Sequence, residues 1–182
     1  MGEFARTLQT AIRDGLVAAR DEFEWREEYG VGGTPVDVVG TPAGDSVEGA
    51  LVAVELEVRR ADPANNTVTL LRALDAGALD RYGRVVVCQV FSAYYDLASG
   101  GVSTKRENAT FVGRLAADAH EHVSYHAVDL PVAPPKRGGD PPADWEAAVD
   151  DAVSTIERRV DDAVDASDRR VDDALDRDVD AS

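Results

Sequence analysis

Apolar residues recur every three to four positions at the start of the chain. The series runs through Phe4, Leu8, Ile12, Leu16, Ala19 and Phe23. A repeat of this period is typical of an amphipathic helix that buries one face. It predicts one helix over residues 1–29, which the glycines of "GVGG" (30–33) end.

The next two segments alternate apolar and polar residues. "TPVDVVG" (34–40) predicts a short strand, and residues 50–59 predict a longer one beyond a Gly/Asp/Ser-rich turn at 41–49. In the longer strand, alternation places one apolar face inward and one charged face outward. We expect the two strands to form a hairpin.

Helices and strands then alternate as far as Pro131. Residues 62–77 predict a helix, because Asp62 and Pro63 fit its first positions and Gly77 its end. The apolar run at 83–95 predicts a strand covered on both faces. A helix over 104–122, with Thr104 as its cap, and a strand over 123–130 complete the order α-β-β-α-β-α-β. Residues 1–131 are thus predicted to be an α/β sandwich with a mixed central sheet.

The C-terminal part has a different composition. Residues 132–144 form a Pro/Gly-rich linker, and residues 145–182 predict an acidic amphipathic helix. Within it, "RRVDDAVDASD" (158–168) is nearly restated as "RRVDDALDRDV" (169–179), an eleven-residue repeat that favours a slight right-handed supercoil. Two interpretations remain open for this tail: a helix through which copies of the chain assemble, or a solvated acidic tail.

Acidic residues outnumber basic ones by 35 to 19, and only Lys105 and Lys136 are lysines. This bias resembles the proteins of salt-loving archaea. A net charge of −16 normally argues against nucleic acid as a partner. In molar salt that argument weakens, because the Debye length falls to about 3 Å.

Targeting signals and redox motifs are not apparent. No apolar run is long enough to span a bilayer, and the N-terminus lacks the layout of a secretory signal. We therefore expect a cytoplasmic protein without membrane contact. The single cysteine, Cys88, lies in the apolar run at 83–95 and is expected to be a buried structural thiol.

Three acidic residues are predicted to meet on the hairpin. Glu55 and Glu57 lie on the same side of the longer strand, about 6.5 to 7 Å apart by the strand rise. Asp37 lies on the neighbouring strand, eighteen residues earlier. The charged face is either simply solvated or holds a cation.

The pattern Pro-x-Asp, followed by Glu-x-Glu about twenty residues later, resembles the PD-(D/E)xK nuclease superfamily, whose fold many restriction endonucleases share. The resemblance extends over the order of elements from the first helix to the strand with Gln89. The last motif position is usually Lys in that family, although some members carry Glu or Gln; here it is Glu57. The resemblance implies a restriction-endonuclease-like sandwich and metal-dependent hydrolysis of DNA.

The chemistry of the three acids agrees with this expectation. Mg²⁺, or Mn²⁺ in its place, prefers hard oxygen ligands and needs only a few carboxylates. Asp37 and Glu55 would supply them with the Leu56 carbonyl, and Glu57 would act as an auxiliary ligand or a base. The bound ion would polarise the phosphodiester and activate water.

Other residues are candidates for supporting roles. The family's first helix often contributes a Glu, for which Glu28 is our candidate, and the helix after the motif places Asn66 and Thr69 one turn apart. Gln89 is expected to face the site. The candidates for phosphate contacts are Arg59, Arg60, Lys105 and Arg106. The alternative function is that of an inactive nuclease-fold scaffold, which assembles through its C-terminal helix.

Overall fold

The computed structural model describes residues 2–44, 49–136 and 138–179, with side chains in the last helix as far as Val164. Residues 45–48 of the predicted turn and Arg137 of the linker lie outside the described residues. So do the side chains of residues 165–179, which include the whole second copy of the eleven-residue repeat. The elements are α1 (Glu3–Ala19), β1 (Phe23–Val31), β2 (Thr34–Pro42), β3 (Ala50–Glu57), α2 (Ala64–Asp75), β4 (Arg84–Ser92), a 3-10 turn (Ala93–Tyr95), α3 (Thr104–Ala119), β5 (Val123–Leu130) and α4 (Trp145–Val179).

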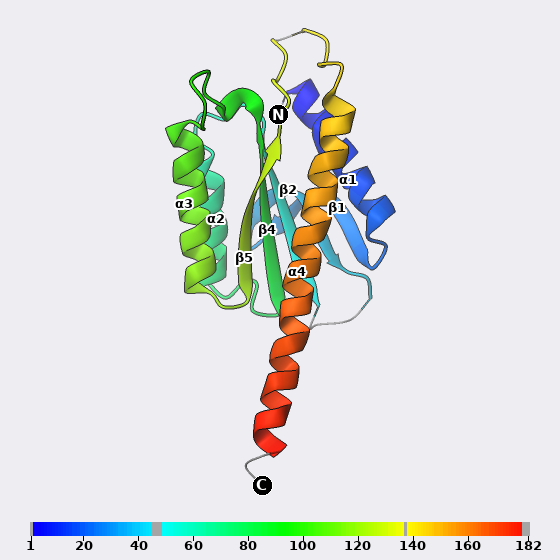
Figure 1. The fold of residues 1–182 in the computed structure, drawn as a ribbon, viewed down its shortest axis with the longest axis vertical. Coiled ribbons are helices and arrows are strands. Elements are labelled where there is room, and N and C mark those ends of the chain that lie inside the picture. The colour runs from blue at the N-terminus through cyan, green and yellow to red at the C-terminus, as the bar shows by residue number, and fades with distance from the viewer. Residues whose placement is uncertain (1, 45–48, 137, 180–182) are drawn as a thin grey trace.

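The described residues form an α/β fold with one open, mixed sheet. Its five strands follow one another in the order β1-β2-β3-β4-β5. The pairs β1–β2 and β2–β3 are antiparallel, whereas β3–β4 and β4–β5 are parallel. Helices α1 and α4 cover one face and α2 and α3 the other (Figure 1). The expected mixed α/β sheet is therefore confirmed at this level.

The prediction of one helix over residues 1–29 is wrong. Helix α1 ends at Ala19, and Phe23–Val31 is strand β1, so the described order is α-β-β-β-α-β-α-β-α. Gly32 and Gly33 have φ values of 57° and 86° and make a two-residue turn between β1 and β2. Positive φ at both central residues is the requirement of a type I′ hairpin turn. The glycines therefore begin a hairpin where we expected them to end a helix.

The C-terminal segment is not the appendage that the sequence indicated. The first half of α4 lies against α1 and the sheet, and its apolar residues belong to the same core as Leu8, Ile12 and Leu16 of α1. Gly15 permits this close approach, because a Cβ there would lie 2.9 Å from a methyl group of Val153. Of the helices in the described part of the chain, none is long and apolar enough to cross a membrane.

Candidate acidic site at the ends of β2, β3 and β4

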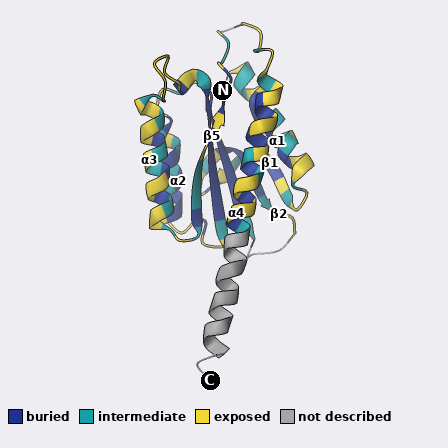
Figure 2. Cartoon of the chain, viewed as in Figure 1, coloured by how far each residue is buried: buried dark blue, intermediate teal, exposed yellow. Residues whose placement is uncertain are grey.

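One face of the central strands changes from apolar to polar toward their carboxyl ends. On β3, Leu51 and Ala53 pack under α2, and the next residues on that face are Glu55 and Glu57. In the parallel register Gln89 of β4 lies beside Glu55. Of the two alternatives for this face, a solvated surface or a cation site, the solvated surface is wrong, because α2 begins directly over it and both carboxylates are buried. The middle strands of the sheet are buried along most of their length (Figure 2).

Asp37 lies where β2 departs from the regular alternation of a strand. Val36 and Val38 would face the same side of a regular strand, but they belong to opposite cores. On β1 the register places Glu28 opposite Asp37, and Glu28 has a φ of 48°. The ladder between β2 and β3 ends at the pair Val38–Val54. Asp37 is therefore the first residue beyond the point where these two strands separate.

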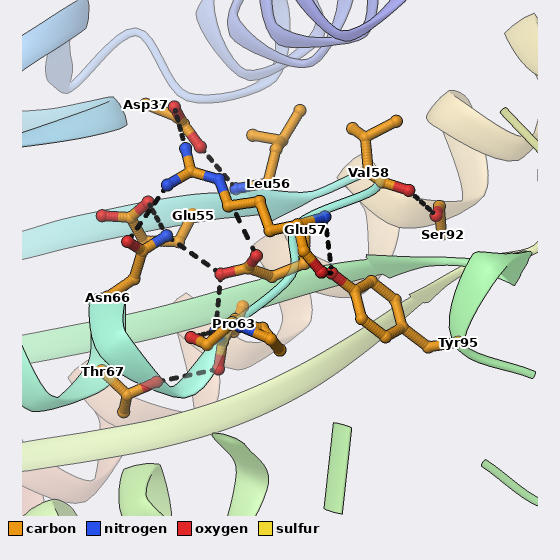
Figure 3. A network of polar contacts seen from close by, with 12 residues as sticks. Asp37, Glu55, Leu56, Glu57, Val58, Pro63, Asn66, Thr67, Ser92 and Tyr95 are labelled. Atoms are coloured by element: carbon orange, nitrogen blue, oxygen red, sulfur yellow. Dashed lines mark hydrogen bonds and ion pairs between the residues drawn. The ribbon is translucent and has the colours of Figure 1, made fainter. Parts of the chain in front are cut away.

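The carboxylate of Asp37 bridges this gap. The backbone N–H of Leu56 donates to Asp37 Oδ2 at 2.7 Å (Figure 3). The carboxyl groups of Asp37 and Glu55 are near enough that each affects the pKa of the other. Gln9 of α1, which the sequence analysis did not single out, donates to the Asp37 carbonyl at 2.7 Å and to Glu28 Oε1 at 3.4 Å. Glu28 thus lies near the site on a strand, and not on the helix to which we assigned it.

Only one carboxylate oxygen of Glu57 accepts hydrogen bonds from the described residues. Its Oε1 accepts hydrogen bonds from Gln89 Nε2 at 2.8 Å and from Asn66 Nδ2 at 3.0 Å. Its Oε2 is buried and accepts no hydrogen bond from the described residues. A buried carboxylate oxygen without a donor is costly, and the nearest cationic atom to it is Arg60 Nε at 3.9 Å.

Hydroxyl groups fix the orientation of Gln89. Its Oε1 accepts from Tyr125 Oη at 2.7 Å and from Thr67 Oγ1 at 3.2 Å, so its amide nitrogen is directed to Glu57. Thr69, the predicted helix residue, instead donates to the Asn65 carbonyl within α2 and does not join the network. The α2 threonine that contacts the network is therefore Thr67, and the prediction of Thr69 is wrong.

Arg60 lies over the three carboxylates. Its guanidinium is 3.6 Å from Asp37 Oδ1 and 3.9 Å from Glu57 Oε2, and its Nη1 donates to Asn66 Oδ1 at 3.1 Å. Its backbone is firmly held, since Tyr95 Oη accepts from its N–H at 3.0 Å and donates to its carbonyl at 3.1 Å. The side chain remains 41% exposed. The backbone is therefore anchored, while the guanidinium makes only long contacts with the acids.

Burial dominates the titration of the acids. It raises the pKa of Glu55 to about 9, and the adjacent Asp37 charge adds to that effect. Burial also raises the pKa of Asp37, although the Leu56 N–H and Arg60 act to lower it. Burial raises the pKa of Glu57 to about 7, although its hydrogen bonds and Arg60 act to lower it. Glu55 therefore holds the proton of its pair with Asp37 at neutral pH.

The remaining basic candidates lie outside this cluster. Arg59 donates to the Pro134 carbonyl at 2.8 Å and lies over the ring of Tyr94. Arg106 is committed to Asp129 at 2.5 Å and to Asp96 at 3.6 Å. Lys105 is exposed in the first turn of α3. Of the four candidates, only Arg60 therefore has a described contact with the acids of this site.

The donor chemistry of the site fits a divalent cation. Asp37 and Glu55 present two neighbouring carboxyl groups, and Glu57 adds the unsatisfied Oε2. Among the described residues, however, no group of three such side chains converges closely enough to hold a metal ion. The counter-charge that the described contacts give Asp37 and Glu57 is the Arg60 guanidinium.

Comparison of the chain with protein-family models, curated proteins and solved structures gives no match. The functional argument therefore rests on the geometry and chemistry of this site.

Proposed function

We propose that this protein is a metal-dependent nuclease that hydrolyses phosphodiester bonds of DNA on a restriction-endonuclease-like fold. Support comes from the position of the motif residues, since Asp37 and Glu55 lie on paired strands whose ladder ends just before them. Gln89 of the next strand also faces the acids. This placement of the three side chains is what the proposal takes from the fold.

The observation that carries the proposal is the burial of Asp37 and Glu55 at the end of the β2–β3 ladder, beside the unsatisfied Oε2 of Glu57. Asp37, Glu55 and Glu57 are 3%, 6% and 0% exposed. The Arg60 guanidinium is the only cation that the described ion pairs place beside these acids. Such a cluster is destabilising unless a cation compensates it. A purely structural role would not require three buried carboxyl groups at one strand edge.

Each residue has a role in this proposal. Asp37 and Glu55 would hold the ion, and Glu57 would be an auxiliary ligand or the base that orients the attacking water. When bound, Mg²⁺ or Mn²⁺ would polarise the phosphodiester and lower the pKa of water. Arg60 would supply the positive charge that the family's pattern places at the position of Glu57, and its guanidinium would bind the substrate phosphate.

Assembly through the C-terminal helix is not part of this proposal. The described apolar residues of α4 that would form such an interface, among them Val149, Val153, Ile156 and Val160, are buried inside the fold. Helix α4 is thereby used as a layer of the sandwich.

Cleavage of DNA by purified variants tests the proposal. Plasmid and single-stranded DNA are incubated with the protein and Mg²⁺ or Mn²⁺ in high KCl, and EDTA provides the metal-free control. We expect cleavage by the unmodified chain and by Asp62→Asn, which changes an exposed acid near the site. Glu55→Gln and Asp37→Asn should lower the rate at least 100-fold.

Equal cleavage by all four proteins would identify a contaminating nuclease, and absence of cleavage with either ion and either DNA would overturn the proposal. Circular dichroism of the two site variants establishes that they fold, so a loss of rate reports on chemistry.

A further inference from the structure

A cavity of about 690 Å³ opens on the other side of the same strand end. It lies between the start of α1, the end of β3 and the loop after β5. Apolar walls are formed by Phe4, Ala5, Leu56, Val58, Pro134 and Pro135. Its volume lies within the range of about 300–1,000 Å³ that is typical of ligand sites.

The polar part of this cavity is cationic. Arg59 and Arg60 line it, and none of the described lining residues is acidic, although the chain has 35 acids. Arg59 is held in place by its hydrogen bond to the Pro134 carbonyl and by the ring of Tyr94. Since only one of its guanidinium N–H groups is used in a described hydrogen bond, the others are available to an anion. The cavity therefore complements a ligand with an apolar body and a negative charge.

The cavity and the acidic site share two residues. Leu56 donates its backbone N–H to Asp37, while its side chain points away from the carboxylates (Figure 3) and lines the cavity. Arg60 lines the cavity and contacts Asp37 and Glu57. A ligand in the cavity would therefore lie next to the carboxylates that the proposed function uses.

We propose that this cavity binds one unpaired nucleotide of the substrate, with the base against the apolar walls and its phosphate on Arg59 and Arg60. The inference rests on the proposed function and extends it. The base of a duplex is stacked and paired, and cannot enter a walled cavity without leaving the stack. The substrate is accordingly single-stranded DNA or a locally unpaired segment, which binds through its bases and backbone together.

Nucleotide binding in EDTA tests the inference apart from cleavage. The probes are thymidine 5′-monophosphate, thymidine, inorganic phosphate and decanoate, each followed by NMR shifts of backbone amides. We expect the monophosphate to shift amides of Ala5 and Val58, and to bind at least tenfold more tightly than thymidine or phosphate alone. If decanoate shifted these amides and the monophosphate did not, the proposal would be overturned. The absence of any monophosphate binding would also overturn it.

Two variants and one control assign the binding to this cavity. Ala5→Trp fills it, and Arg59→Gln removes a cation without changing the walls; each should weaken monophosphate binding at least tenfold. Val17→Trp changes an exposed position of the same helix and should leave the affinity unchanged. Unchanged affinity in both cavity variants would overturn the inference.

Cleavage separates this inference from the proposed function. If the chain cuts DNA, a single-stranded oligonucleotide should be cut faster than its duplex, and Arg59→Gln should reduce that preference. Equal cutting of both forms overturns only the cavity's role. Nucleotide binding without any cleavage would leave the cavity assigned and overturn only the nuclease.

Discussion

The Leu56 N–H donates to Asp37 Oδ2 at 2.7 Å, where a continuous β2–β3 ladder would offer a backbone carbonyl. The carboxylate thus completes the sheet at the point where the strands separate. Because the same group affects the pKa of Glu55, one side chain connects the backbone of the fold with the chemistry of the site.

This double role predicts different stabilities for two substitutions at Asp37. Asp37→Asn and Asp37→Ala both remove the charge, but only Asn retains an oxygen that can accept from Leu56. We expect Asp37→Ala to have a free energy of unfolding lower than that of Asp37→Asn by about 1–3 kcal/mol. Urea unfolding in EDTA measures the difference. Equal values for the two variants would show that the hydrogen bond does not support the sheet.

The pKa of Glu55 predicts how the stability of the metal-free protein changes with pH. A carboxyl whose pKa rises on folding, here to about 9 because of burial and Asp37, binds more protons in the folded state than in the unfolded one. Its contribution to stability is complete below its unfolded pKa and is lost as the pH rises through its folded pKa. We therefore expect the free energy of unfolding to fall between pH 5 and pH 9.

The variant Glu55→Gln isolates this effect, since it removes the titrating group at a similar volume. In EDTA, the unfolding free energy of the unmodified chain should fall relative to that of Glu55→Gln as the pH rises. A difference that stays constant from pH 5 to pH 9 would contradict the assignment. Added Mn²⁺ should reverse the trend, because a metal binds the deprotonated carboxylate.

The position of Arg60 predicts an unusual effect on metal affinity. Since its guanidinium lies 3.6 Å from Asp37 Oδ1 and 3.9 Å from Glu57 Oε2, it competes with a divalent ion for these carboxylates. We expect Arg60→Gln to bind Mn²⁺ more tightly, as titration calorimetry measures directly, while its cleavage rate falls. Arg59→Gln is the matched control and should leave Mn²⁺ affinity unchanged, because Arg59 contacts no acid of the site. Weaker Mn²⁺ binding by Arg60→Gln would show that the arginine supports the ion and does not compete with it.

Much of the fold follows from short-range patterns. The strand predicted at 123–130 is β5, and the helix predicted to begin at Trp145 does so. The failure at residues 20–31 has a specific cause: Phe23 continues the spacing of the first helix after Ala19. The alternation of Phe23, Trp25, Tyr29 and Val31, followed by two glycines, was the signal for a hairpin.

The meeting of Asp37 and Glu55 was predictable, but their surroundings were not. Pairing of the two strands in the register Val38–Val54 brings the next residues, Asp37 and Glu55, to the same place. The burial of Glu57 depends on where α2 begins, and a strand pattern does not contain that information. Arg59 and Arg60 look alike in the sequence; only the backbone path after β3, fixed by Tyr95, sends Arg60 to the carboxylates and Arg59 to the Pro134 carbonyl.

The packing of α4 predicts that an interior substitution destabilises the whole fold. Ile156 is fully buried in the core shared with α1, so Ile156→Ala should lower the free energy of unfolding by about 2–5 kcal/mol. Ser154→Ala on the exposed side of the same helix should change it by less than about 0.5 kcal/mol. Because the contact is intramolecular, both values should be the same at protein concentrations tenfold apart. If Ile156→Ala instead lowered the mass in light scattering and left unfolding unchanged, α4 would be an assembly helix and not a layer of this domain.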